Sequence, residues 1–149
     1  MFDSLPGIGN KTKARLLGEL GTDPERFKDA DALRAYAGSA PVTQQSGKSR
    51  VVFMRRSCNK WLRYAMHWLA DLSRSDCVWA AAYYARKKEQ GKTHAAALRS
   101  LAGRWQKILW KMIQTGQCYD PEVHLRNMIR HGSWVVQLLP AADATPATT

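Results

Sequence analysis

The sequence has few cysteines, and their spacing would not hold a metal or a disulfide framework. Its three cysteines, Cys58, Cys77 and Cys118, form no CxxC pair and are odd in number. Disulfide frameworks and zinc sites use paired or clustered cysteines at short spacings. We therefore expect reduced thiols, which are typical of a cytoplasmic protein.

Histidines are also sparse, and none belongs to a metal-binding pattern. No HxxxH spacing and no nearby cysteine or carboxylate cluster accompanies any of the four, which are His67, His94, His124 and His131. Metal sites in proteins need several such ligands at defined spacings. Asp120 and Glu122 flank Pro121 and are interpreted as helix-capping residues instead. We expect this chain to hold no metal and no cofactor of its own.

Long hydrophobic runs are missing as well. No apolar stretch approaches the roughly 20 residues that a helix needs to cross a bilayer, and no signal peptide opens the chain. We therefore expect no membrane partner. With 149 residues, the chain has about the length of one domain with a modest core.

Acidic residues are in short supply, and this is the most informative shortage. The chain has 23 lysines and arginines against 12 acidic residues, for a formal net charge of +11. Between Asp31 and Asp71 there is no carboxylate, whereas seven basic residues occur there: Arg34, Lys48, Arg50, Arg55, Arg56, Lys60 and Arg63. Such one-signed density favours a polyanion, above all nucleic acid. A solvated basic face is the alternative.

The apolar periodicity and the capping signals predict a mainly α fold. Helices are expected over residues 10–20, 29–37, 59–73, 77–90, 94–115 and 121–131, with a loop and a short strand or hairpin between residues 39 and 57. Asp29 or Asp31 is expected to cap the second of these helices, Asp76 the fourth and Thr93 the fifth. The predicted organisation is a helix-hairpin-helix region (1–38), a basic loop (39–58), a bundle of three to four longer helices (59–139) and a disordered tail (140–149). Together they are expected to form one compact domain.

The core is predicted from the same periodicity. In the helix over 59–73, the inward stripe is assigned to Trp61, Ala65, Trp68, Leu69 and Leu72. In the helix over 94–115, the inward residues are expected to be Leu98, Leu101, Ala102, Trp105, Leu109 and Met112. The six tryptophans are mostly assigned to the core, although the spacing leaves open whether one or two stack on bases.

The first motif is Leu5-Pro6-Gly7-Ile8-Gly9 followed by a helix with a basic first turn. Proline and glycine favour a tight turn, and the free N–H groups at a helix start suit a phosphate oxygen. The pattern is typical of the hairpin and second helix of a helix-hairpin-helix, with contacts expected from Gly7, Ile8, Gly9, Lys11 and Lys13. An ordinary turn before a helix is the alternative. Such contacts hold a nucleic-acid backbone without reading its sequence.

The second motif is Gln45-Ser46-Gly47-Lys48-Ser49-Arg50. A serine beside a glycine can present its hydroxyl freely, and nearby cations could stabilise charge on an attacked phosphate. From the residues alone, a hydrogen-bonding turn serine is the simpler interpretation. Nucleic-acid contacts in this segment are assigned to Lys48, Arg50, Arg55, Arg56, Lys60 and Arg63.

The order of these motifs resembles the C-terminal domain of the insertion-sequence 110/116/902 transposases, a family of RNA-guided DNA recombinases. The landmarks are LPGIGNKTKARLLGELG, then PERFKDADALRAYAGSAPVTQQSGKSR, then RRSCNKWLRYAMHWLA, with the later KTHAAALRSLAGRWQKILWKMI helix and Tyr119. They cover roughly residues 4–119. LPGIG alone occurs in many DNA repair proteins, whereas AYAG-x-AP-x-x-x-QSG is more specific. The segment from Phe53 to Asn59 departs from the GxxxKRGN of several family loops.

The resemblance implies a chemistry that the residues alone do not. In this family a serine becomes covalently joined to DNA, and Ser46 matches its position, with Ser49 as the fallback. An RNase-H-like domain of acidic residues, expected to bind a divalent metal, would precede Met1, so we expect a fragment, a truncated reading frame or a domain supplied by another chain. The implied partners are DNA, a guide RNA, and a second copy or a partner chain that carries the RNase-H-like domain. A non-catalytic helix-hairpin-helix nucleic-acid-binding module, or a decayed reading frame, is the alternative.

Overall fold

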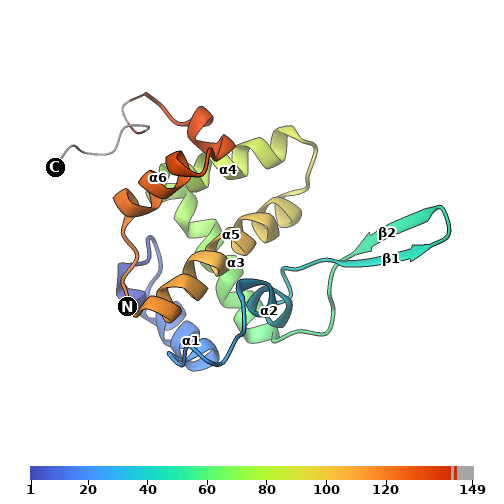
Figure 1. Ribbon diagram of the computed structural model, residues 1–149, viewed down its shortest axis with the longest axis horizontal. Coiled ribbons are helices and arrows are strands. Elements are labelled where there is room, and N and C mark those ends of the chain that lie inside the picture. The colour runs from blue at the N-terminus through green and yellow to red at the C-terminus, as the bar shows by residue number, and fades with distance from the viewer. Residues whose placement is uncertain (142, 144–149) are drawn as a thin grey trace.

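The computed structural model describes residues 1–141 and 143 of the chain, which fold into α-helices and one β-hairpin (Figure 1). The α-helices are α1 (Asn10–Leu20), α2 (Ala30–Tyr36), α3 (Lys60–Asp76), α4 (Val78–Glu89), α5 (His94–Thr115) and α6 (Pro121–Arg130). The strands are β1 (Val42–Ser46) and β2 (Ser49–Phe53), and two short 3-10 helices are η1 (Phe2–Ser4) and η2 (Trp134–Leu138). The mainly α fold predicted from the sequence is confirmed.

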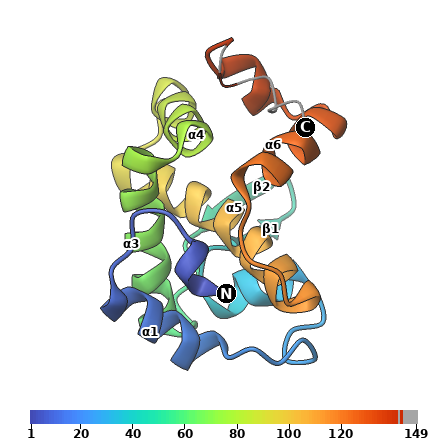
Figure 2. The ribbon, with the colours of Figure 1, turned by 90° about the vertical axis from the view of Figure 1, so that its left-hand side faces the viewer.

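Two long helices form the centre of the molecule. α3 and α5 pack against each other; α1 lies on α3, α2 lies on α5, and α4 contacts both central helices. Figure 2, a view at right angles to Figure 1, shows α1 at the end of the bundle opposite to α4 and α6. The hairpin contacts none of these helices as an element and projects away from the bundle in Figure 1.

The core is centred on Trp105, which is fully buried on α5. Its indole Nε1 donates a hydrogen bond of 2.9 Å to the hydroxyl of Ser73, a buried polar residue on α3. A polar partner of this kind removes the cost of burying the N–H group and fixes the register of the two helices. All six α5 residues expected to face inward are buried, as predicted.

Most helix starts follow the capping signals in the sequence. The side chains of Asp29, Asn59, Thr93 and Asp120 accept hydrogen bonds from backbone N–H groups in the first turns of α2, α3, α5 and α6. The interpretation of Asp120 as a cap is therefore confirmed. Asp76 as the cap of α4 is wrong, because Asp76 is the last residue of α3 and Cys77 caps α4 without a side-chain bond.

The predicted inward stripe of α3 is wrong in part. Trp61 and Trp68 are 63% and 41% exposed, and Leu72 is only partly buried, whereas the buried α3 residues are Leu62, Ala65, Met66, Leu69, Ala70 and Ser73. The helix carries two apolar faces, and the one with the larger aromatic side chains faces outward. Residue size alone favoured the wrong face, since the inward surface must interlock with α5 at close range.

The C-terminal part of the chain closes over one end of the bundle. η2 contacts both α4 and α6, and Val135 within it is fully buried. The tail expected to be disordered falls, except for residues 140, 141 and 143, outside the described residues. No helix within the described part of the chain has the length and apolarity that crossing a membrane requires.

Candidate nucleic-acid interface

The loop before α1 is anchored by its apolar residues and shaped by its first glycine. Leu5 and Ile8 are buried in the core, which holds the loop against the bundle. Gly7 has a φ of +73°, and a Cβ there would lie 2.9 Å from the backbone oxygen of Leu72 and from a carboxylate oxygen of Asp76. Gly7 therefore lets the loop pack on the C-terminal end of α3, a role that the sequence analysis did not assign.

The second glycine is the one that faces open space. Gly9 caps α1 without a side-chain bond, has an ordinary φ of −81°, and has nothing within 4 Å of a Cβ built on it. The first N–H groups of a helix have no partner within the helix, and they carry the positive end of its dipole. Lys11 beside them is exposed, whereas Lys13 is half-buried and forms an ion pair of 3.4 Å with Asp3. The exposed part of the loop is therefore Gly9, Lys11 and the start of α1.

Next to this helix lies an exposed aromatic surface of α3. The guanidinium of Arg15 lies over the rings of Trp61 and Tyr64, with its carbon 5.0 Å and 5.8 Å from their centroids. Trp79 and Trp105 are buried, whereas Trp61 and Trp68 are exposed on α3, where Trp68 contacts the Tyr64 ring edge-on. Aromatic and guanidinium groups of this kind are surfaces on which unpaired bases stack.

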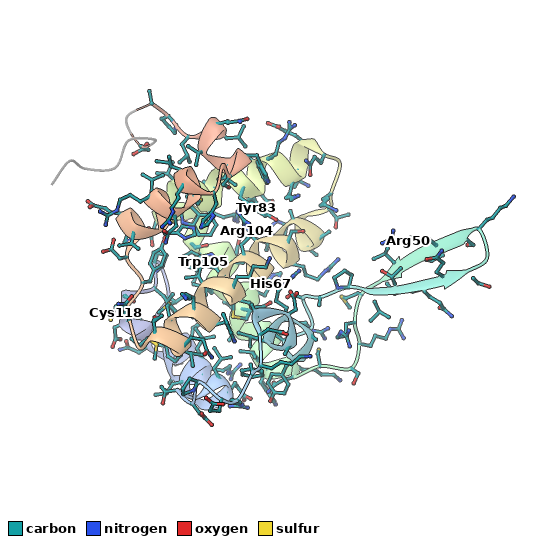
Figure 3. All side chains as sticks on the ribbon, in the orientation of Figure 1. Arg50, His67, Tyr83, Arg104, Trp105 and Cys118 are labelled. Atoms are coloured by element: carbon teal, nitrogen blue, oxygen red, sulfur yellow. The ribbon has the colours of Figure 1, made fainter. Side chains whose placement is uncertain are left out.

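The Ser46 motif forms the turn of the β-hairpin. β1 and β2 pair antiparallel, from Val42 opposite Phe53 to Ser46 opposite Ser49, and leave Gly47 and Lys48 as a two-residue turn. Gly47 has a φ of +55° and no described non-glycine residue has a positive φ, which matches a turn that needs glycine at its first central position. Every residue of both strands is exposed. Figure 3 shows Arg50 on this projecting hairpin, away from the bundle that contains Trp105.

The register assigns the polar groups of the tip to two faces. Directly opposed residues of an antiparallel pair point to the same side, so Ser46 and Ser49 share one face. Arg50 pairs with Gln45 and therefore lies on the other face. Lys48 lies in the turn between the two serines. The two cations closest in sequence to Ser46 therefore lie in different places: Lys48 is in the turn, and Arg50 is on the opposite face of the hairpin from Ser46.

The hairpin carries no proton acceptor stronger than a hydroxyl or an amide. No histidine or carboxylate occurs between residues 32 and 66 of the chain, and no described group of three or more His, Cys, Asp or Glu residues could hold a metal ion. A serine hydroxyl needs a base or a metal to become a strong nucleophile. The hairpin therefore presents a hydroxyl and positive charge without a histidine or a carboxylate of its own.

The remaining basic residues differ in accessibility. Arg56 and Lys60 are exposed, whereas Arg55 and Arg63 are half-buried. Arg63 donates a hydrogen bond of 3.3 Å to the backbone oxygen of Arg55 and so stabilises the link from the hairpin to α3. Asn59 extends this link, because its side chain donates to Glu19 at 2.6 Å and to the Tyr36 hydroxyl at 2.8 Å.

Tyr119 belongs to the core rather than to the exposed basic surface. Its hydroxyl accepts a hydrogen bond of 3.0 Å from Trp79 Nε1, and its ring contacts Trp105 edge-on. Burial raises the pKa of Tyr119 and, together with Arg104, lowers the pKa of the neighbouring His124 to about 4. The buried Tyr119 and the partly buried His124 are neutral near pH 7, and together with Trp79 and Trp105 they join α4, α5 and α6.

The predicted contact residues form two separate basic surfaces. The loop before α1 and the hairpin lie on opposite sides of the bundle in Figure 1, so a single phosphate cannot contact both. Residues 1–85, which contain both surfaces and all of α3, match the family described as Transposase IS116/IS110/IS902. The chain belongs to this family. The predicted resemblance is thereby confirmed at the level of the family.

Proteins related to this family member include insertion-element proteins and a gene-inverting protein. The chain is 41% identical over 119 residues to the mini-circle putative transposase for IS117 of Streptomyces coelicolor, with 80% of this chain and 29% of that protein covered. It is 34% identical over 119 residues to an IS900 protein of Mycobacterium paratuberculosis, where the coverage is 79% and 30%. A pilin gene-inverting protein of Moraxella bovis is 31% identical over 130 residues, covering 83% of this chain and 39% of that protein. The chain thus spans about three tenths of the length of the first relatives.

Proposed function

We propose that this chain is a DNA-contacting part of a transposase or site-specific recombinase, and that the Ser46 hydroxyl is the group that joins to DNA. The observation that carries the proposal is the position of Ser46 at the exposed tip of a hairpin that projects from a basic, carboxylate-free segment. A duplex can approach this tip without meeting the bundle. The names of the relatives, a transposase and a gene-inverting protein, are consistent with such a reaction.

In the proposed step, Oγ of Ser46 attacks a backbone phosphorus atom. The bond from phosphorus to one sugar oxygen breaks as the bond to Oγ forms, and that sugar oxygen leaves as a hydroxyl group after it takes up a proton from an acid outside the hairpin or from water. The Ser46 proton passes to a base that lies outside the hairpin, because the hairpin contains neither a histidine nor a carboxylate. Lys48 offsets the negative charge that develops on the phosphate oxygens.

A divalent metal does not fit the described residues of this chain, which bring no sufficient group of acidic, cysteine or histidine ligands together. We assign the metal, as the family resemblance implies, to an acidic RNase-H-like domain in another part of a longer protein or in a partner chain. Self-association and a guide RNA belong to the same proposal. We place the reaction in the cytoplasm, consistent with the free cysteines Cys58, Cys77 and Cys118.

We assign the loop before α1 a supporting role as the backbone-gripping half of a helix-hairpin-helix. Gly9 and Lys11 are exposed at the positive end of α1 and suit a phosphate oxygen. On the opposite side of the bundle from the hairpin, this surface would hold a second nucleic-acid segment, either DNA or the guide RNA. A phosphate contact there would position the complex without reading bases.

The test compares Ser46→Ala with Ser49→Ala, two changes on the same face of the same tip. Each variant is mixed with the RNase-H-like half and end-labelled DNA, and the covalent protein–DNA species is measured on a denaturing gel. Ser46→Ala should abolish the species, whereas Ser49→Ala should retain most of it. Covalent product from Ser46→Ala would show that Ser46 is not the nucleophile.

The absence of a base on the hairpin favours one second candidate, a non-catalytic nucleic-acid-binding module. This candidate predicts salt-dependent DNA binding that is the same for wild type and Ser46→Ala, without any covalent species. DNA binding that does not respond to salt would contradict both candidates, since each relies on contacts between cations and phosphates.

A further inference from the structure

A pocket of about 360 Å³ opens at the foot of the hairpin, where the end of β2 meets the loop after α2 and the first turns of α5. Four basic side chains line it, which are Arg34, Arg55, Lys92 and Arg99, and no carboxylate does. Its volume is at the lower end of the range of about 300–1,000 Å³ that ligand sites occupy. Only Arg55 among these four belongs to the interface predicted from the sequence.

Two of the lining arginines have a buried donor atom without a partner. The Nε atoms of Arg34 and Arg55 are buried and have no hydrogen-bond partner among the described residues. An unpaired buried N–H group of a guanidinium is costly unless a ligand or water accepts its hydrogen bond. Arg34 also forms an ion pair, in which its Nη1 lies 2.9 Å from Oδ1 of Asp31.

A glycine in the middle of α5 keeps this arrangement open. A Cβ on Gly103 would lie 3.3 Å from Nε of Arg34, which is closer than most such contacts. Glycine inside a helix costs about 1 kcal/mol relative to alanine. Here it allows the Arg34 guanidinium to lie against α5 beside the pocket.

The other two cations are free to act on a ligand. Lys92 is exposed in the loop before α5, and Arg99 is half-buried on the second turn of α5. Neither side chain takes part in an ion pair or hydrogen bond within the described chain. Like charges that gather around one pocket repel each other unless an anion neutralises them.

We propose that this pocket binds a phosphate of the DNA backbone and anchors the strand whose neighbouring segment reaches the hairpin tip. The inference rests on the proposed function, because it specifies how DNA is held relative to Ser46. From Phe53 at the pocket to Ser49 at the tip, four residues of strand span about 14 Å. This equals the rise of about four base pairs of duplex DNA, so the anchored phosphate lies about four base pairs from the phosphate at the tip.

The test uses the double variant Lys92→Gln/Arg99→Gln. The matched control is Lys107→Gln/Lys111→Gln, which removes the same charge from exposed positions further along α5. At about 0.1 M salt, the pocket variant should bind duplex DNA roughly tenfold more weakly, and its slope of log K against log salt should be shallower by about 0.9. The control should lose less than about twofold, and both melting temperatures should stay within about 2 °C of wild type.

A second arm identifies the phosphate. Neutral methylphosphonate linkages are placed one at a time along the DNA. A methylphosphonate at one position should weaken DNA binding by the wild type and leave DNA binding by the pocket variant unchanged. The neutral linkage and the two substitutions remove the same contact, so their effects do not add. Equal losses from the pocket and control variants, or the absence of any such position, would overturn the inference.

A third arm separates DNA from free phosphate. Inorganic phosphate is titrated at constant ionic strength, and weak competition by it is expected. Binding of inorganic phosphate to the pocket, combined with unchanged DNA binding by the pocket variant, would also overturn the inference. If the pocket fails these tests while Ser46→Ala still abolishes the covalent species, the proposed function stands without it.

Discussion

At the scale of single residues, the two glycines of the loop before α1 have different roles, although the sequence suggests one role for both. Gly7 fits against the backbone of α3 with a positive φ, whereas Gly9 faces open space with a φ that any residue adopts. The difference depends on Leu72 and Asp76 of α3, which are distant in the chain, so the local motif could not reveal it. Only Gly9 is a clean probe of phosphate binding.

Gly7→Ala should lower the free energy of unfolding by about 2–4 kcal/mol, because it adds backbone strain and a steric clash. Gly9→Ala should leave stability nearly unchanged and weaken binding to all DNA sequences alike, because its Cβ would keep a phosphate away from the start of α1. Thermal melts and DNA titrations measure the two effects. Normal DNA affinity in a folded Gly9→Ala variant would contradict the role of this loop in binding.

His124 predicts a pH dependence of stability. Its pKa in the folded protein is about 4, below the ordinary value of 6.5, chiefly because of burial. Between these values the unfolded chain binds more protons than the folded one, so stability is full above about pH 6.5 and falls as the pH drops toward 4. The loss should be at most about 3 kcal/mol.

His124→Phe keeps an aromatic ring beside Trp79, 4.9 Å away in the wild type, and removes the titration. The unfolding free energy of this variant should therefore fall less between pH 7 and 4 than that of the wild type. His131→Gln, a change at an exposed position, should follow the wild-type curve. Identical curves for all three proteins would show that His124 is not a buried neutral group.

At the scale of elements, the start of α3 joins three helices through one side chain. Asn59 caps α3 and also donates to Glu19 of α1 and to Tyr36 at the end of α2. Asn59→Ala should therefore cost about 1–2 kcal/mol and lower the melting temperature by roughly 2–8 °C. Asn127→Ala, at an exposed position of α6, should change it little. Equal melting temperatures for the two variants would contradict the role of Asn59.

The sequence could predict the start of a helix where a capping side chain within the same turn determines it. Thr93 and Asp120 cap α5 and α6 as predicted, and Asp29 caps α2 as one of the two aspartates that the sequence offered for it. The inward face of α3 could not be predicted in the same way, because both of its faces are apolar. Packing against α5 selects Leu62 and Met66, and it leaves Trp61 on the surface beside Arg15.

At the scale of the whole molecule, positive charge lies on separate surfaces rather than in one groove. The sequence shows directly that residues 32–70 contain basic residues and no carboxylate. It did not show that the hairpin projects away from the bundle or that Lys92 and Arg99 line a pocket at its foot. The position of the pocket depends on contacts between distant segments, whereas the assignment of Arg50 to the face opposite Ser46 depends on the register of the hairpin.

The proposed function requires the whole molecule to place Ser46 against DNA and to receive its activator from elsewhere. Mass spectrometry of the covalent protein–DNA species, after digestion with nuclease and protease, tests this most directly. The account predicts a nucleotide attached to Oγ of Ser46, in the peptide that contains Gln45-Ser46-Gly47-Lys48. A nucleotide on Ser49 or on any other residue would contradict it, and so would a reconstituted, DNA-cleaving complex in which this chain carries no nucleotide at all.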